Sequence, residues 1–135
     1  MIDRVIRVLL VDDDEDDYKM FKELISEISS PKIAVEWASS YENGKTALAR
    51  RAHDVCFLDF RLGGKTGIDI LRESAAAGIK TPMILLTGYG EHEVDLEAMR
   101  LGAADYLVKD QVTPHLIERS IRYSDRKSTR LNSSH

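Results

Sequence analysis

The sequence is poor in the residues that build disulfide frameworks, thiolate metal centres and membrane spans. It has one cysteine among 135 residues, which excludes an internal disulfide and a cysteine-rich metal site. That residue, Cys56, lies inside an apolar run, where a small buried hydrophobic side chain is the simplest interpretation. No stretch reaches the ~20 apolar residues that a membrane span needs, and the first residues lack the apolar core of a signal peptide. We therefore expect a cytoplasmic protein.

The chain also lacks an excess of basic residues. Its 23 acidic and 19 basic residues give a formal net charge of -4, which argues against direct nucleic-acid binding, because that needs clustered Lys and Arg. A hydrophobic fraction of 43% and a length of 135 residues suit one globular domain with a real core. We place this domain at residues 1–124 and interpret the polar, aperiodic residues 125–135 as a tail that is disordered or not native.

Short β-branched runs alternate with stretches of helical period along the domain. The runs predicted as strands are Val5–Val11, Ile33–Trp37, Val55–Leu58, Met83–Leu86 and Ala104–Val108. The stretches predicted as helices are residues 16–28, 42–51 and 67–77, one marked by Val94, Ala98 and Leu101, and a last helix from Pro114 to about Tyr123. Strict alternation of this kind predicts an α/β fold, a single doubly wound (βα)5 parallel sheet with helices on both faces.

Polar residues suited to phosphate chemistry follow four of the predicted strands. Asp12 and Asp13 follow the first strand, Asp59 the third, Thr87 the fourth and Lys109 the fifth. In doubly wound sheets, ligands bind outside the carboxyl ends of the strands, near the point where the strand order reverses. If the sheet has the flavodoxin-like order 2-1-3-4-5, strands one and three are neighbours. The three carboxylates would then meet at that point, with the threonine and the lysine along the same edge.

The chemistry of this set favours phosphoryl transfer. Carboxylates this close repel one another unless a cation compensates, and oxygen ligands suit Mg²⁺. A carboxylate nucleophile, a divalent ion, a lysine and a hydroxyl are the groups that phosphoryl transfer onto Asp59 requires. Each residue alone also has a plainer explanation. For the acids from Asp14 to Asp17 we adopt it: Asp14 as N-cap, and Asp17 in the first helical turn, facing solvent.

Four segments of the chain together resemble the receiver domains of bacterial two-component response regulators: VLLVDDDEDD, VCFLDFRLGGKTG, MILLTGYG and GAADYLVKD. The resemblance covers about residues 4–124. It implies that Asp59 accepts a phosphoryl group from a sensor histidine kinase or a phosphotransfer protein. Such a domain is a signalling switch that catalyses only its own phosphorylation and dephosphorylation, so we do not expect an enzyme.

The resemblance also implies how the metal would be held. Asp13 would be a direct Mg²⁺ ligand together with Asp59, and Asp12 would act largely through metal-bound water. The backbone carbonyl of Arg61 would be the third protein ligand.

A switch of surface is the next implication of the resemblance. Lys109 and Thr87 would hold the phosphoryl oxygens, and Tyr106 would change rotamer with Thr87. The surface expected to change combines the helix marked by Val94 to Leu101, strand Ala104–Val108 and the last helix. It is the candidate face for an output domain, an effector or a homodimer. Leu96 and Met99 fall off the inner stripe of their helix, so we expect them to be exposed.

Two positions depart from the family pattern. Gly63 stands four residues after the acceptor, where most members have proline, so we expect a more mobile loop there. Asp110 follows Lys109 in place of a second proline, which in the family often follows a cis bond. A cis bond before another residue costs about 2.5–4 kcal/mol, so we expect the Lys109–Asp110 peptide to be trans.

Two other functions stay open at this point. A phosphatase of the haloacid-dehalogenase type also uses an aspartate after a strand, with Mg²⁺, but Asp59-Phe60-Arg61 lacks the second acid of that motif, and the chain is short for a substrate cap. A pseudo-receiver that only binds partners is the other alternative. The complete set of five site residues argues against it.

Overall fold

The computed structural model describes residues 4–88 and 92–133, with side chains up to Ser124. Its main sheet has five parallel strands in the order β2-β1-β3-β6-β7. Counted along the chain, this is the order 2-1-3-4-5, which confirms the expected fold class. The bounds of these strands are β1 Val5–Val11, β2 Lys32–Ala38, β3 Val55–Asp59, β6 Met83–Thr87 and β7 Asp105–Val108.

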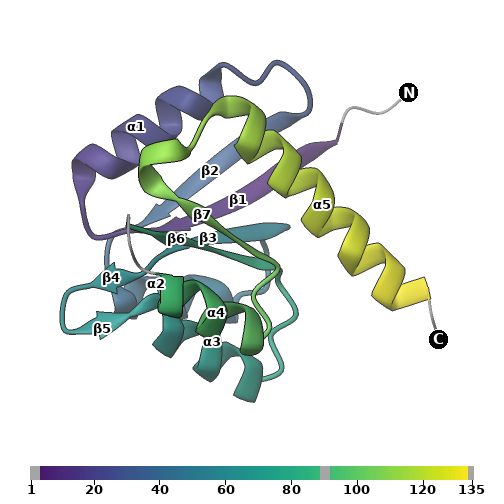
Figure 1. Cartoon of the computed structure of the whole chain (residues 1–135). Helices are drawn as coiled ribbons and strands as arrows, with labels where there is room; N and C mark the ends of the chain where they lie inside the picture. Colours follow the sequence, from purple (N-terminus) through teal and green to yellow (C-terminus); the bar gives the residue numbers. More distant parts are fainter. Residues whose placement is uncertain (1–3, 89–91, 134–135) are drawn as a thin grey trace.

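The helices cover both faces of the sheet, as Figure 1 shows. Helices α1 and α5 lie on one face, and α2, α3 and α4 lie on the other. Their bounds are α1 Glu15–Ser26, α2 Tyr41–Ala49, α3 Gly67–Ala76, α4 His92–Arg100 and α5 Pro114–Ser133. Helix α5 continues past the end near Tyr123 that the sequence predicts, because residues 124–133 contain neither the proline nor the glycine that would stop it.

The central strands are buried on both faces, which fixes the register of the sheet. In β1, Val8 and Leu10 pack into the core under α1 and α5, while Leu9 and Val11 pack into the core under α2, α3 and α4. Phe57 of β3 is fully buried and meets Phe21 of α1 with ring centroids 5.0 Å apart. Burying such side chains stabilises the fold by roughly 1.5–3 kcal/mol each, so a slip of one residue in register would be costly.

Two short elements were not predicted from the sequence, and both border the ends of the strands. Strands β4 (Arg61–Leu62) and β5 (Lys65–Thr66) form an antiparallel hairpin after β3, with Gly63 at φ 70°. A 3-10 turn, η1 (Lys109–Gln111), follows β7.

The peptide between Lys109 and Asp110 is trans, as expected, since Ser30–Pro31 is the cis bond among the described residues. No helix within the described ranges combines the length and the apolar character needed to cross a bilayer.

Candidate functional site

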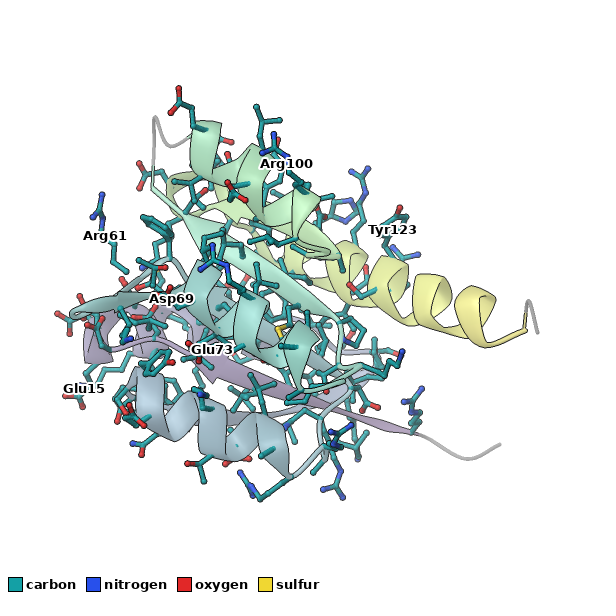
Figure 2. All side chains as sticks on the ribbon, turned by 90° about the horizontal axis from the view of Figure 1, so that it is seen from below. Glu15, Arg61, Asp69, Glu73, Arg100 and Tyr123 are labelled. Atoms are coloured by element: carbon teal, nitrogen blue, oxygen red, sulfur yellow. The ribbon has the colours of Figure 1, made fainter. Side chains whose placement is uncertain are left out.

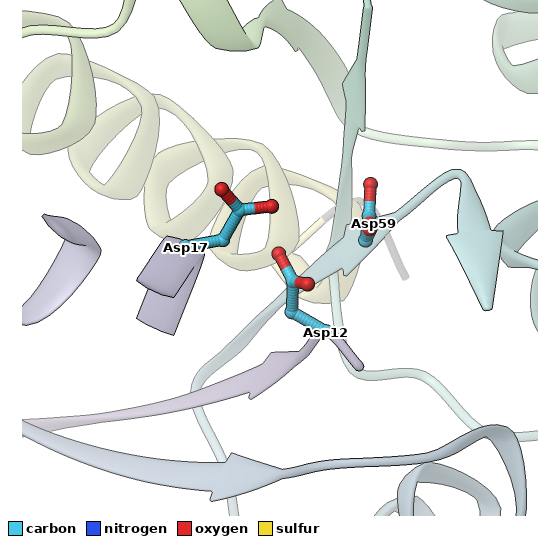
Figure 3. Close-up of side chains that lie close together, drawn as sticks. All are labelled: Asp12, Asp17 and Asp59. Atoms are coloured by element: carbon cyan, nitrogen blue, oxygen red, sulfur yellow. The ribbon is translucent and has the colours of Figure 1, made fainter. Parts of the chain in front are cut away.

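The carboxyl ends of β1 and β3 place two of the predicted acids side by side. Val11 pairs with Leu58 in the parallel register, so the residues that follow, Asp12 and Asp59, lie at the same edge of the sheet (Figure 3). Their exposed fractions are 1% and 6%. The backbone N–H of Asp14 donates to Asp12 Oδ1 at 2.9 Å, which holds that carboxylate in place.

Lys109, directly after β7, brings a positive charge to these acids. Its Nζ lies 3.0 Å from Asp59 Oδ1 and 3.5 Å from Asp12 Oδ2. The prediction that strand ends bring these three groups together is therefore met by the geometry. The lysine side chain keeps 27% of its surface exposed, so the site is open to solvent on one side.

The expectation that Asp17 faces solvent is wrong. Its carboxylate Oδ2 accepts a hydrogen bond from Lys109 Nζ at 2.6 Å, and Figure 3 shows it turned toward Asp12 and Asp59. The reason is the start of α1: Asp14 caps the helix through its side chain, as expected. Asp17 then falls four residues before buried Phe21, on the inner face of the helix. That spacing was the sequence signal for a role in the site.

Asp13 and the hairpin close the rim of the site. Asp13 is exposed and lines a cleft of about 260 Å³ that is also lined by Asp17, Asp59, Arg61 and Lys109. Figure 2 shows Arg61 of the hairpin at the same end of the molecule as Glu15 of α1, the end where the strands finish. All the sequence-predicted metal residues therefore lie in or beside this cleft. The three carboxylates that lie within 4.8 Å of one another, however, are those of Asp12, Asp17 and Asp59, so Asp17 takes the place predicted for Asp13 in that cluster.

Thr87, at the end of β6, contributes an unusual hydroxyl. The residue is fully buried, and its Oγ1 has no hydrogen-bond partner within residues 4–88 and 92–133. A buried hydroxyl without a partner is costly, so this atom is suited to an oxygen supplied by a ligand. Tyr106 of β7 is half-buried and packs against the core under α2, α3 and α4.

The charges of the site perturb one another. Burial, opposed in part by a backbone hydrogen bond, raises the pKa of Asp12 to about 7. Burial also raises the pKa of Asp59, although Lys109 works in the opposite direction. Burial alone would lower the pKa of Lys109, but hydrogen bonds to Asp17 and Asp59 outweigh it and raise that pKa. One lysine does not balance three ionised acids, so their charges favour a further cation in the site.

The donor set fits a hard divalent cation. Asp12, Asp17 and Asp59 each offer a carboxylate oxygen, and these atoms all lie within 4.8 Å of one another. Oxygen-only donors of this kind suit Mg²⁺, which binds through a few carboxylates and keeps several waters. The residues present are therefore compatible with Mg²⁺.

A second surface lies on the far side of β7, over α4 and α5. Leu96 and Met99 have exposed fractions of 53% and 41%, which confirms the expectation that they face outward. Tyr123 of α5 is 51% exposed, and Figure 2 shows it and Arg100 on this side of the molecule. This surface contains a groove of about 690 Å³, which is lined in part by Met99 of α4, Tyr106 of β7 and Tyr123 of α5.

Known proteins resemble this chain over most of its length. Residues 8–121 match the family model of the response regulator receiver domain. The transcriptional regulatory protein QseB of Escherichia coli O157:H7 is 36% identical over 104 residues, which are 77% of this chain and 46% of QseB. The acid tolerance regulatory protein ActR of Sinorhizobium medicae is 34% identical over 116 residues, which are 83% of this chain and 58% of ActR. The chain thus spans less than two thirds of the length of these relatives.

Solved structures agree with the fold. A response regulator receiver domain protein from Clostridium thermocellum superposes with a TM-score of 0.83 at 27% identity, covering 93% of this chain and 98% of that one. The receiver domain of the Francisella response regulator 1452 gives a TM-score of 0.79 at 25% identity, covering 90% and 98%.

Proposed function

Because the chain belongs to the response regulator receiver domain family, we propose that it receives signals by accepting a phosphoryl group on Asp59. The donor would be a partner histidine kinase or a phosphotransfer protein in the cytoplasm. The observation that carries the proposal is the meeting of three groups at the strand ends. They are a buried carboxylate, a lysine whose Nζ lies 3.0 Å from it, and a buried threonine hydroxyl that has no hydrogen-bond partner among the described residues. The receiving unit would be residues 1–124, with 125–135 as a tail.

The proposed reaction is an in-line displacement at phosphorus. A carboxylate oxygen of Asp59 forms a bond to phosphorus, while the bond from phosphorus to the donor nitrogen or oxygen breaks and its electron pair stays on the leaving group. Asp59 must be ionised to attack, and its buried setting opposes this. Lys109 compensates, because its positive charge favours the ionised carboxylate before the reaction and the phosphoryl oxygens afterwards.

Asp12, Asp13, Asp59 and the carbonyl of Arg61 are the residues that would hold Mg²⁺. When bound, the ion would neutralise negative charge on the phosphoryl oxygens during the transfer of the phosphoryl group. The surplus of negative charge in the cleft supports this assignment. So does its donor chemistry: Asp12 and Asp59 offer carboxylate oxygens within 4.8 Å of each other, and Asp13 and Arg61 line the same cleft.

Thr87 and Tyr106 would carry the signal away from the site. Phosphorylation adds roughly 1.5–2 negative charges and new acceptor oxygens. The hydroxyl of Thr87, which lacks a partner in the described part of the chain, would donate to one of them. Its movement would leave space for Tyr106 and change the surface of α4, β7 and α5. An effector, an output domain or a second copy of the chain would read that surface.

Acetyl phosphate labelling tests the proposal directly. The protein should gain one phosphoryl group in intact-protein mass spectrometry when Mg²⁺ is present and none after the ion is chelated. Asp59→Asn should abolish the gain. Asp54→Asn is a matched control, because Asp54 lies just before the other end of the same strand and pairs with Arg4. A label that survives in Asp59→Asn would contradict the assignment.

A further inference from the structure

Lys109 is held by Asp17, a residue that is not among those proposed to react or to bind Mg²⁺. Its Nζ lies 2.6 Å from Asp17 Oδ2, closer than the 3.0 Å to Asp59 Oδ1. Asp17 belongs to α1 and is 92 residues away in the sequence, so this contact spans the site from one element to another. The two side chains are 28% and 27% exposed, which shields the pair from water more than an ordinary surface ion pair.

The Lys109 side chain is long and flexible, so the contacts at its charged end decide where the ammonium group lies. A lysine side chain has four flexible methylene groups and loses much rotamer freedom when it is held in one place. Lys109 opens the short turn η1, and the residue after it is the exposed Asp110. An ammonium group has three N–H donors. Lys109 can therefore keep its bond to Asp17 while it donates to Asp59 or to a phosphoryl oxygen.

The first turn of α1 argues against a general role for Asp17 in helix electrostatics. Glu15, Asp16 and Asp17 are all acids of that turn, and each would interact favourably with the helix dipole. Glu15 and Asp16 are exposed, whereas Asp17 is half-buried and bonded to Lys109. The contact with the lysine therefore distinguishes Asp17 from its neighbours.

We propose that Asp17 is a positioning residue: it holds the Lys109 ammonium beside Asp59 and so speeds phosphorylation. The inference rests on the proposed function of Asp59. A charge that is already in place when the phosphoryl group arrives stabilises the transition state without having to be ordered during the reaction. Asp17 itself touches neither the phosphorus nor the leaving group in this scheme.

Labelling rates of matched variants of the full chain test the inference, with acetyl phosphate as donor and Mg²⁺ present. Asp17→Asn and Asp16→Asn each remove one negative charge from the same helical turn. We expect Asp17→Asn to label about five- to tenfold more slowly than wild type, as for a lost contact between directly interacting groups. Asp16→Asn should keep the wild-type rate. Asp17→Glu should recover most of the rate, because its carboxylate can still reach the lysine.

A background without the lysine provides the second test. Lys109→Ala and Lys109→Ala combined with Asp17→Asn should label equally slowly over a long incubation, because Asp17 acts through the lysine. An equal fold-loss in both backgrounds, an Asp17→Asn rate at or above that of Asp16→Asn, or no recovery in Asp17→Glu would overturn the inference. Thermal unfolding checks that each variant is folded. Loss of labelling in wild type, or its survival in Asp59→Asn, would instead reject the proposed function.

Discussion

At the scale of single residues, the buried acids of the site lower the free energy of unfolding when they are ionised. Asp12 is 1% exposed and lies beside Asp59, so its ionised form is costly without a bound cation. Burial is the main reason that its pKa rises from 3.8 to about 7. The folded protein therefore binds a proton at Asp12 more tightly than the unfolded chain does. In the absence of divalent ions, this residue makes the free energy of unfolding decrease as the pH rises from about 4 to about 7.

Asp12→Asn should remove that cost. We expect the variant to be more stable than wild type by about 1–2 kcal/mol at pH 8 in the presence of EDTA, and nearly equal to it at pH 4. Urea unfolding at both values measures the difference. Asp16→Asn removes the same charge from an exposed position and should change little. A variant less stable than wild type at pH 8 would show that the hydrogen bonds of Asp12 matter more than its burial.

Gly67, at the start of α3, is fixed by a close approach to the backbone of Asp59. A Cβ atom there would lie 2.6 Å from the carbonyl oxygen of Asp59 and 2.8 Å from Cδ1 of Leu85. We expect Gly67→Ala to cost about 1–3 kcal/mol, since the carbonyl cannot move without disturbing the site. Gly64→Ala meets nothing within 4 Å and serves as the control in chemical denaturation. Equal stabilities of the two variants would contradict this account.

At the scale of elements, the β4–β5 hairpin follows Asp59 and lies at the rim of the cleft. Its turn contains Gly63 at φ 70°, a backbone region that glycine reaches without steric cost. Proline has φ fixed near −65° and cannot adopt it. The proline that most family members carry at this position is therefore incompatible with this hairpin. The greater mobility expected for this loop stays a prediction.

Gly63→Pro should thus destabilise the protein, although it restores the family pattern. We expect a loss of about 1–3 kcal/mol in the free energy of unfolding, measured by urea denaturation. Gly63→Asn should lose less, because asparagine tolerates positive φ better than most residues. A stabilised Gly63→Pro variant would mean that the turn can change to another conformation.

The elements also show what the sequence alone could predict. Strand β1 has the predicted bounds, because a short, mostly apolar run that ends at acidic residues is typical of a buried strand. The hairpin was missed, since two-residue strands carry no periodicity. Asp17 was misassigned for a different reason. The helix dipole gave a sufficient local explanation for it, while its actual partner, Lys109, lies far along the chain and becomes its neighbour only after folding.

At the scale of the whole molecule, two adjacent strands, β6 and β7, connect the cleft to the α4–β7–α5 surface. Thr87 ends β6 and pairs with Val108 of β7, the residue before Lys109. Tyr106 lies two residues earlier on β7 and also lines the groove that includes Met99. A ligand can shift such a system only by binding one arrangement more tightly than the other, so a phosphoryl group should favour one packing of this region.

Amide exchange with and without beryllofluoride, a phosphoryl mimic, tests that coupling. We expect the mimic and Mg²⁺ together to change exchange in the Asp59 loop and also in residues 96–99 and at Tyr106. The first residues of β1 should serve as an internal reference, because they lie at the end of the strand opposite Asp12. Changes confined to the Asp59 loop would reject the proposed transmission, and Asp59→Asn should show none.

The indole of Trp37 gives the chain an optical probe of its own. It is the single tryptophan in the sequence, and its Nε1–H donates to the backbone carbonyl of Asp12 at 2.7 Å. The ring also stacks on Tyr18 with centroids 4.4 Å apart, one residue beyond Asp17. We therefore expect events that move Asp12 or the first turn of α1 to change the emission of this fluorophore. Stopped-flow emission could follow cation uptake and phosphorylation in real time, without a dye and in the unmodified protein.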